Sequence, residues 1–315
     1  MSSSASGENP PALFSRVPDL WRERLTRLGG IAAQNHLPAA AVGGCVRDLL
    51  LGLNPKDWDV VVEGRAAPLV HSAAKVLSAR VVEHPRFMTF TLHFQDGTHL
   101  DVATARAETY SQSGALPLVR RATLAEDARR RDFTSNALYL SLSPESGSLL
   151  DPTGGQADMK ARLLRALHDQ SFIDDPTRLH RAARYSSRYG WAVEEKTMGF
   201  IREAVSEERP RSVSLVRLRH ELFRILEEED PVPALRSTWE WGLWKFWDAD
   251  WKLTDVLAQR VKSTPRESPP VQRLAAFLSP HPITAEAALK RFSTPMDLRR
   301  RVLAFLAQGQ PIERA

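Results

Sequence analysis

Apolar residues follow two different periods along this chain, and the change between them falls near residue 150. In the first part, residues 86–94 alternate between apolar and polar positions, and three consecutive valines follow Asp59, as expected for strands. Helical spacing occurs beside these strands and then dominates the rest of the chain. The segments with helical spacing are 18–36, 46–52, 68–79, 157–167, 176–188, 209–229, 271–278 and 283–306, the last interrupted before Pro295. We therefore predict an α+β fold, with a small mixed sheet followed by helices.

Turn residues separate these segments. Asp96-Gly97 predicts a hairpin that joins the alternating segment to a strand over residues 99–104. Ser113-Gly114 and Pro117 predict a loop within residues 104–132. Thr123 and Glu126 form a capping box, so a short helix should follow that loop.

The periods and turns suggest four regions: a disordered lead-in over residues 1–17, a head over 18–150, a helical neck over 151–230 and a short helical body and tail over 231–315.

Hydrophobic residues make up 43% of the 315 and charged residues 26%, as is usual for a globular protein. No apolar run approaches the roughly 20 residues of a membrane span. The single cysteine, Cys45, excludes an internal disulfide and a cysteine-based zinc site. We therefore expect no membrane association and a cytoplasmic location.

Basic residues are clustered, although the net charge is only +5. Arg129, Arg130 and Arg131 are consecutive, and Arg299–Arg301 form a second run. Such runs are usually solvated faces, but they also suit an anionic partner such as nucleic acid.

Gly43 and Gly44 lie where an apolar strand should pass into a helix. Residues without a Cβ allow a ligand close to the backbone, and the exposed N–H groups of a helix start favour an anion. Arg47 follows one helical turn later. This junction is a candidate phosphate-binding turn.

Asp57 and Asp59 should point to the same side of the strand that Asp59 opens, because residues two apart on a strand share a face. Paired carboxylates of this kind can share two divalent cations. The alternative is a solvated strand edge whose acids face water. A further ligand could come from Asp101 or Asp132, and the sequence leaves that choice open.

Three strings in the chain resemble one family. GGCVRDLLLG…KDWDVVV resembles the signature of polymerase-β-like nucleotidyltransferases, in the class of CCA-adding tRNA nucleotidyltransferases and bacterial poly(A) polymerases. RRDFTSNAL is similar to the family's RRDFTxNAL motif, and DDPTRLHRAAR to its EDxxRxxRAxR motif, with Asp174 where glutamate is common. The resemblance extends from about residue 40 to about residue 230.

This resemblance implies a template-independent enzyme that adds C, A or both to the 3′ end of tRNA. It implies two Mg²⁺ ions held by the catalytic Asp57 and Asp59. The implied nucleotide-binding residues are Gly43, Gly44, Arg47, Arg131, Asp175, Arg178, Arg181 and Arg184. In the family, the acid and the arginine that match Asp175 and Arg178 read the base of CTP or ATP. The tRNA acceptor arm would bind to positive surfaces of the neck and body.

Several alternatives stay open. The product can be CC, A or complete CCA, with a complementary enzyme finishing the end in the first two cases. A poly(A) polymerase shares every motif, and a catalytically silent RNA-binding relative shares the fold. Five tryptophans within residues 239–251 could stack on unpaired bases, but their helical spacing favours packing.

Overall fold

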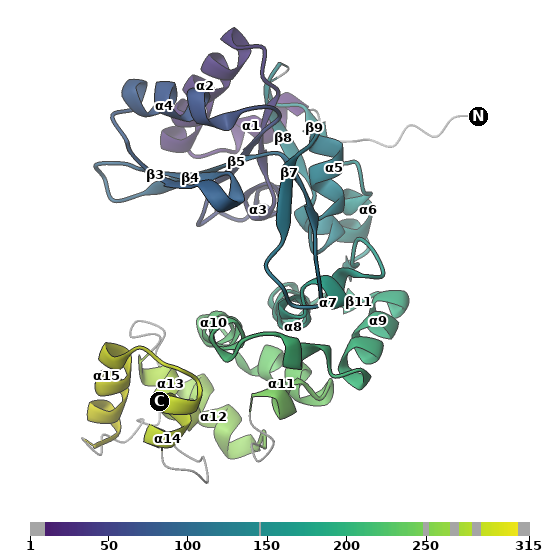
Figure 1. The fold of residues 1–315 in the computed structure, drawn as a ribbon, viewed down its shortest axis with the longest axis vertical. Coiled ribbons are helices and arrows are strands. Elements are labelled where there is room, and N and C mark those ends of the chain that lie inside the picture. The colour runs from purple at the N-terminus through teal and green to yellow at the C-terminus, as the bar shows by residue number, and fades with distance from the viewer. Residues whose placement is uncertain (1–9, 145, 248–251, 265–270, 279–284, 308–315) are drawn as a thin grey trace. The chain divides into compact units, whose positions relative to one another are not determined.

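The computed structural model describes residues 10–144, 146–247, 252–264, 271–278 and 285–307. The chain divides into two compact units, traced in chain order in Figure 1. The first comprises Met1–Thr109, Pro117–Ala161 and Arg165–His168, and the second comprises Tyr110–Leu116, Arg162–Leu164 and Asp169–Ala315. None of the described helices is both long and apolar enough to cross a membrane.

A mixed sheet of seven strands organises the first unit, with the order β3-β4-β5-β2-β1-β8-β9. The strands are β1 (Ala39–Val42), β2 (Asp59–Val62), β3 (Arg80–His84), β4 (Thr89–His93), β5 (His99–Thr104), β8 (Tyr139–Ser143) and β9 (Leu149–Leu150). β2 and β5 are parallel, whereas the other pairs are antiparallel. The predicted hairpin at Asp96-Gly97 is present, since β4 pairs with β5 around it. The predicted mixed sheet is therefore confirmed.

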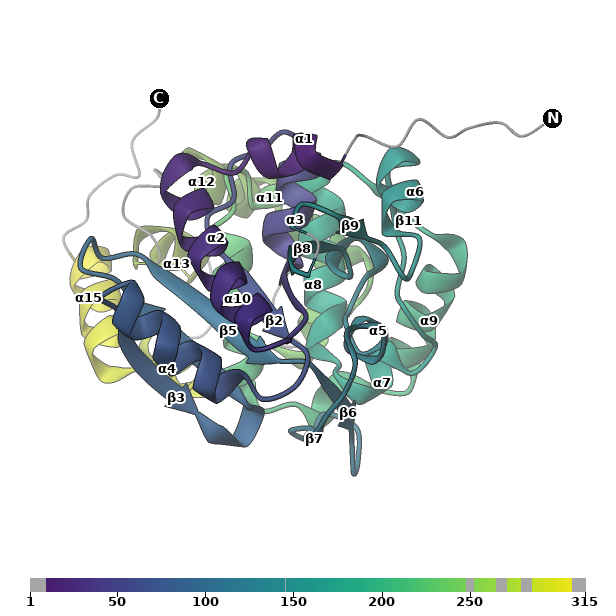
Figure 2. The ribbon, with the colours of Figure 1, turned by 90° about the horizontal axis from the view of Figure 1, so that it is seen from above.

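Two helices cover one face of this sheet, α2 (Asp19–Gln34) and α4 (Ala66–Val76), and lie side by side (Figure 2). Arg24 of α2 binds side chains of the β4–β5 hairpin. Its guanidinium lies 3.7 Å from the ring centroid of Phe94 and donates to Asp96 Oδ2 at 2.7 Å and to Thr98 Oγ1 at 2.7 Å. The remaining helices of this unit are α1 (Pro10–Ser15), α3 (Gly44–Leu50), α5 (Leu124–Arg129) and α6 (Gly155–Lys160).

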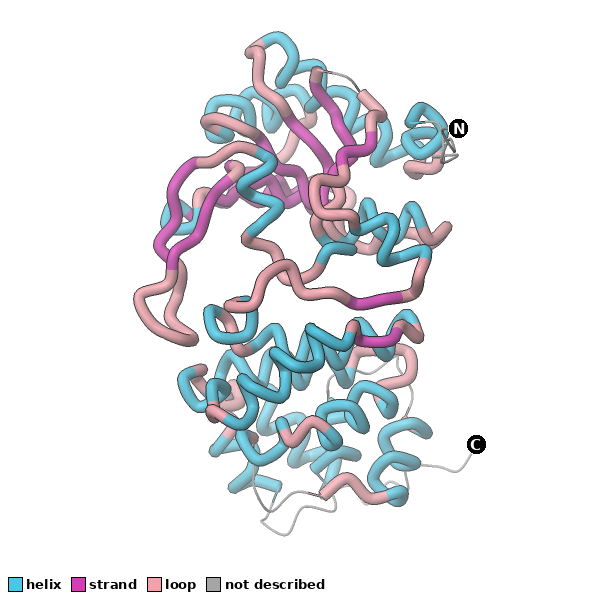
Figure 3. Tube along the Cα trace, turned by 90° about the vertical axis from the view of Figure 1, so that its right-hand side faces the viewer, coloured by secondary structure: helices cyan, strands magenta, loops and turns pink. Residues whose placement is uncertain are grey.

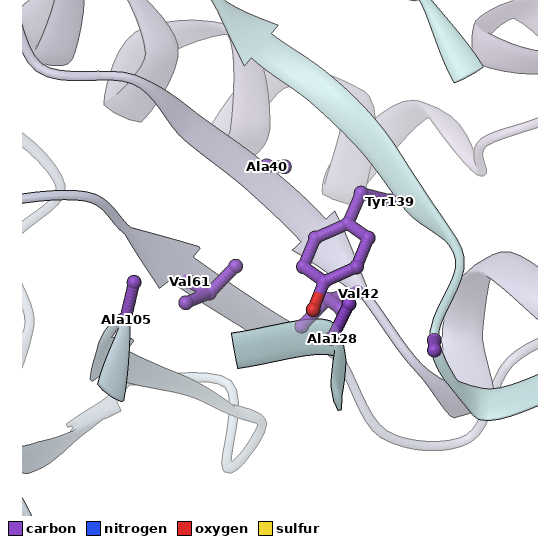
Figure 4. Close-up of a cluster of buried hydrophobic side chains, with 7 residues drawn as sticks. Ala40, Val42, Val61, Ala105, Ala128 and Tyr139 are labelled. Carbon is purple, nitrogen blue, oxygen red and sulfur yellow. The ribbon is translucent and has the colours of Figure 1, made fainter. Parts of the chain in front are cut away.

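A small apolar cluster joins the central strands to α5. It contains Ala40, Val42, Val61, Ala105, Ala128, Ala137 and Tyr139 (Figure 4). The members from β1 are two residues apart, as alternation along a strand requires. Small side chains dominate the cluster, so α5 can approach the sheet closely. The short helix opens with the predicted capping box of Thr123 and Glu126.

The loop predicted at Ser113-Gly114 and Pro117 is present over residues 110–117, but the sequence did not predict the two strands that flank it. β6 (Arg106–Thr109) and β7 (Leu118–Arg121) pair as an antiparallel ribbon, and only the tip between them is irregular. Leu118 is 68% exposed, so the ribbon has no buried apolar face that alternation could have revealed. The tip, Tyr110–Leu116, belongs to the second unit.

The second unit is built mainly of helices, as the distribution of strands and helices in Figure 3 shows. They are α7 (Ser171–Asp174), α8 (Thr177–Tyr189), α9 (Glu195–Ser206), α10 (Leu215–Leu226), α11 (Val232–Glu240), α12 (Asp255–Ser263), α13 (Val271–Leu278), α14 (Ala285–Arg291) and α15 (Met296–Ala307). The predicted interruption before Pro295 is present between α14 and α15. The helix predicted over 157–167 is wrong beyond Lys160, because β10 (Leu163–Leu164) pairs with β11 (Ala192–Val193) instead.

The tryptophan-rich segment packs inside this unit. Trp244 and Trp247 are fully buried, and Trp244 donates from Nε1 to Thr238 Oγ1 at 2.8 Å. Trp239 lies edge-on to Trp244 at 5.5 Å between ring centroids and is partly exposed. The packing interpretation is confirmed for the two buried rings, while Trp251 lies outside the described residues.

Candidate active site

The glycine turn lies between β1 and α3, as predicted. Gly43 has φ +79°, a conformation that L side chains rarely adopt. A Cβ at Gly43 would lie 3.2 Å from Arg131 Nη1, and a Cβ at Gly44 would lie 3.4 Å from Arg47 Nη2. Two guanidinium groups therefore lie directly against the backbone of the turn. Since α3 has only seven residues, its dipole is small, and these arginines are the main positive charges there.

Arg47 is buried and held from two sides. Its Nε and Nη2 donate to Asp48 Oδ1 at 3.0 and 2.9 Å, and its Nη1 donates to Asn136 Oδ1. Asn136 is fixed in turn by Asp132, whose Oδ1 accepts from Asn136 Nδ2 at 2.9 Å and from Phe133 N at 2.9 Å. Asp132 thus orders the segment that positions Arg47.

Arg131 is held by a buried carboxylate that the sequence did not single out. Asp127 Oδ2 accepts from Arg131 Nη2 at 2.9 Å and from the Tyr139 hydroxyl at 3.0 Å, and Asp127 Oδ1 accepts from Arg130 Nε at 2.9 Å. Burial works to raise the pKa of Asp127, but Arg131 and Arg130 outweigh it and hold that pKa at about 2. Asp127 therefore stays ionised and fixes the direction of Arg131.

Asp59 opens β2, and Asp57 lies two residues before it. Both side chains are exposed, whereas Trp58 between them is buried and stacks on Trp21 at 5.6 Å between ring centroids. The exposed–buried–exposed pattern expected for residues 57–59 is therefore present, although Asp57 precedes the strand. Asp101 on β5 pairs in register with Asp59, and Asp101 N donates to Trp58 O at 3.1 Å. Of the two candidates for a further acid, Asp101 is thus the neighbour of the pair, while Asp132 is buried within its own turn.

The surroundings of Asp59 disfavour its negative charge. Although its side chain reaches solvent, the protein atoms packed around the carboxylate displace bulk water and raise its pKa. Arg131 lowers the pKa and Asp101 and Asp57 raise it, and the net result is a pKa of about 6. The Cys45 thiol is buried, and burial raises its pKa to about 12, so it stays protonated and unreactive. Mutual repulsion of the acids is relieved when a cation lies between them.

These acids fit a hard divalent cation in their donor type. Carboxylate oxygens are the ligands that Mg²⁺ prefers, and it commonly completes its shell with water and substrate phosphates. Within the described part of the chain, no group of three or more His, Cys, Asp or Glu side chains is already arranged as a metal cage.

In the second unit, Asp175 and Arg178 lie at the start of α8. The helix begins at Thr177, one residue later than predicted, and Asp175 Oδ1 still accepts from Thr177 N at 3.1 Å. Arg178 is buried and donates from Nη1 to Ser171 Oγ at 2.8 Å. Each side chain thus has one partner close to it in sequence.

The other arginines of α8 are engaged differently. Arg181 is half-buried and donates from Nη2 to the Tyr185 hydroxyl at 3.3 Å. Arg184 is buried and donates from Nη1 to Glu228 Oε1 at 3.3 Å, and Arg188 binds the same carboxylate through Nε at 2.8 Å. Arg184 therefore joins α8 to the end of α10, a bracing contact that the sequence did not reveal.

Known proteins resemble this chain over most of its length. A family model described as the poly A polymerase head domain matches residues 39–165. An A-adding tRNA nucleotidyltransferase of Geobacter sulfurreducens is 39% identical over 248 residues, 76% of this chain and 28% of that protein. A CC-adding tRNA nucleotidyltransferase of Deinococcus radiodurans is 35% identical over 306 residues, 96% of this chain and 77% of that protein. This chain belongs to the tRNA nucleotidyltransferase family.

A solved member of this family has the same fold. The Thermotoga maritima CCA-adding enzyme, complexed with tRNA, matches with a TM-score of 0.76 and 31% identity, over 96% of this chain and 73% of that one. The match confirms the α+β fold that the resemblance implied. The chain spans only 28% and 52% of the lengths of two A-adding tRNA nucleotidyltransferases that it matches.

Three residues that the sequence did not predict hold side chains of the predicted site. Asp127 follows the capping box directly, Asn136 belongs to the RRDFTSNAL string, and Glu228 is the middle residue of the EEE run after α10. Each orients an arginine of the predicted set. The only sequence signal for these three residues was their position within or beside the family motifs. Which arginine each one binds is determined by the fold.

Proposed function

We propose that this chain is a template-independent nucleotidyltransferase that adds C, A or both to the 3′ end of tRNA, using CTP or ATP in the cytoplasm. The observation that supports it most is the neighbourhood of Asp59: Asp57 and Asp101 lie beside it, and Arg131, which acts on its charge, lies against the glycine turn. The family relation makes tRNA the expected acceptor, and a solved family member contains it.

Asp57 and Asp59, with Asp101 beside them, would hold two Mg²⁺ ions. Bound there, the ions would supply a stabilised attacking 3′-oxygen and charge neutralisation of the leaving pyrophosphate. Arg47 and Arg131 would bind the triphosphate at the glycine turn, because their fixed planar forks match phosphate oxygens. The 3′-hydroxyl of the RNA forms a bond to the α-phosphorus, the bond to pyrophosphate breaks, and the hydroxyl proton passes to a carboxylate or to water.

Asp175 and Arg178 would select the base. A carboxylate accepts from the exocyclic amine that both C and A carry, and a guanidinium donates to the adjacent ring nitrogen. U and G present a different order of donors and acceptors, so a protein side-chain pair can discriminate without a nucleic-acid template. Arg181 and Arg184 would support this pair, Arg184 through the contact of α8 with Glu228.

The product decides between the members of the family. Purified protein is incubated with tRNA that lacks CCA and, separately, with tRNA that ends in CC, and CTP and ATP are offered singly. Extension of the first by CTP alone indicates CC addition, extension only of the second by ATP indicates A addition, and both together indicate complete CCA addition. A generic oligonucleotide extended by ATP as fast as tRNA would instead indicate a poly(A) polymerase. Incorporation into none of these acceptors would contradict the proposal.

A further inference from the structure

Arg217 of α10 forms two hydrogen bonds that link distant parts of the chain. Its Nη2 donates to Asp175 Oδ1 at 2.8 Å, and its Nη1 donates to the carbonyl oxygen of Gly114 at 2.8 Å. Asp175 precedes α8, and Gly114 lies in the ribbon tip, so one guanidinium joins three segments of the second unit. Both side chains are partly buried, with 29% of Arg217 and 22% of Asp175 exposed.

The hydrogen bonds to Asp175 all end on one of its two oxygens. Oδ1 accepts from Arg217 Nη2, from Thr177 N at 3.1 Å and from Thr177 Oγ1 at 2.6 Å. Within the described residues, no protein donor reaches Oδ2. A carboxylate offers about four acceptor positions, so Oδ2 keeps its capacity to accept from a ligand. The carboxylate is thus held through Oδ1, and Oδ2 can accept from a ligand.

The second acceptor of Arg217 is itself well anchored. Gly114 N donates to Asp174 O at 3.2 Å, and Ser113 Oγ donates to Ile173 O at 2.7 Å. A Cβ at Gly114 would lie 2.4 Å from Ser212 Oγ, so the tip packs tightly against the segment before α10. The Gly114 carbonyl therefore gives Arg217 a fixed support.

We propose that Arg217 is the positioning residue of the base-selecting carboxylate, setting the direction in which Asp175 Oδ2 accepts from the amine of C or A. The inference rests on the role proposed above for Asp175. Two acceptors at fixed positions require the rigid fork of an arginine, which a lysine amine does not reproduce. Loss of Arg217 should reduce base discrimination rather than nucleotide binding as such.

The test measures equilibrium binding of CTP, ATP, GTP and UTP to the full chain without RNA. The wild type should favour CTP, ATP or both over GTP and UTP, and Arg217→Ala should reduce that preference by about tenfold, the effect of one charge-assisted hydrogen bond. Arg217→Lys should recover only part of it. Arg224→Ala is the matched control, because Arg224 is exposed on the same helix and should leave the preference unchanged.

A double variant distinguishes positioning from general structure. In an Asp175→Ala background, Arg217→Ala should cause no further loss of base preference, since the arginine acts through that carboxylate. Arg217→Gln provides a neutral variant of similar length if thermal unfolding shows that Arg217→Ala is unfolded. A folded Arg217→Ala or Arg217→Gln with the wild-type preference, or effects that add in the double variant, would overturn the proposal. So would a wild type that binds all four nucleotides equally.

Primer extension by the wild type is measured in parallel. A wild type that extends no RNA, but whose base preference depends on Arg217, would refute the proposed reaction and support the role of Arg217.

Discussion

Asp59 on β2 and Asp101 on β5 are register partners in a parallel pair of strands. Thr91 Oγ1 of β4 donates to Asp101 Oδ1 at 2.6 Å and so restrains that carboxylate. The acid pair that the sequence predicted is therefore part of a group of three that spans two strands. The third member comes from a hairpin about forty residues further along the chain.

Asp101→Asn should lower the rate of nucleotide incorporation by about tenfold to a hundredfold, the usual range for groups that support metal ligands. The rate is measured in single-turnover experiments over a series of Mg²⁺ concentrations. Thr91→Val is the graded control, since it removes only the restraint on Asp101 and should cause a smaller loss. An unchanged rate for Asp101→Asn at every Mg²⁺ concentration would exclude Asp101 from the metal centre.

Gly43→Ala should weaken binding of the nucleoside triphosphate, because a Cβ there would crowd Arg131 Nη1 at 3.2 Å. It should also destabilise the fold by about 1–2 kcal/mol, since an L residue disfavours positive φ. Gly52→Ala is the control: Gly52 also has positive φ, but nothing lies within 4 Å of its Cβ position. Both variants should lose stability in chemical denaturation, whereas only Gly43→Ala should raise the nucleotide Kd. Equal Kd values for the two variants would contradict a role of the turn in binding.

Asp127→Asn should remove the buried negative charge that binds Arg130, Arg131, the Tyr139 hydroxyl and the Arg106 backbone N–H. Breaking a buried ion pair on one side costs about 3 kcal/mol, which denaturation should reveal. The stability from Asp127 is present above its ordinary pKa of 3.8 and is lost as the pH falls toward about 2. Nucleotide KM should rise more than kcat falls, because Arg131 loses its orientation. Glu126→Gln is the control, because Glu126 is half-buried and its hydrogen-bond partners are Arg120 and Thr123, so this variant should not change KM. A KM for Asp127→Asn equal to the wild type would refute the positioning role.

His180 should make the second unit acid-sensitive. The ring is fully buried, stacks on Trp247 at 5.0 Å, and neither ring nitrogen has a hydrogen-bond partner among the described residues. Burial lowers its pKa from 6.5 to about 3, so below pH 6.5 the unfolded chain binds a proton that the folded chain does not. Stability therefore falls with falling pH over that interval.

Between pH 7.5 and pH 5.5 this difference amounts to about 1.4 kcal/mol in the free energy of unfolding. His180→Phe keeps an aromatic ring against Trp247 and should remove that part of the pH dependence. Urea denaturation of both proteins at the two pH values measures it. Identical pH dependence in the wild type and the variant would show that His180 is protonated in the folded state.

Local patterns predicted the features that depend on neighbours in sequence. The order Asp57, Trp58, Asp59 fixes which side chains share a strand face, and the glycines before Arg47 mark a turn whatever the rest of the chain does. Thr123 and Glu126 cap their helix through contacts three residues apart. Such signals survive because the interactions behind them are short-range.

Features that depend on distant partners could not be predicted. From the sequence, a charged residue such as Asp127 is expected to be exposed, and its burial depends on hydrogen bonds from the distant Tyr139 and Arg106. Arg217 and Asp175 are 42 residues apart in the sequence and form a hydrogen bond only in the folded chain. The ribbon over residues 106–121 lacks an apolar face, so neither the alternation of a strand nor the spacing of a helix identifies it in the sequence. Leu163 and Leu164 fit a helical pattern, but pairing with Ala192 and Val193 overrides it.

The most direct test compares the wild type with Asp59→Ala in single-turnover incorporation of labelled nucleotide into tRNA, with tRNA binding measured on the same samples. We predict that Asp59→Ala lowers incorporation by more than about a hundredfold, because an acid that holds the metal ions is lost, while tRNA affinity stays nearly unchanged. Incorporation by Asp59→Ala at a rate close to that of the wild type would contradict the assignment of the metal-binding acids.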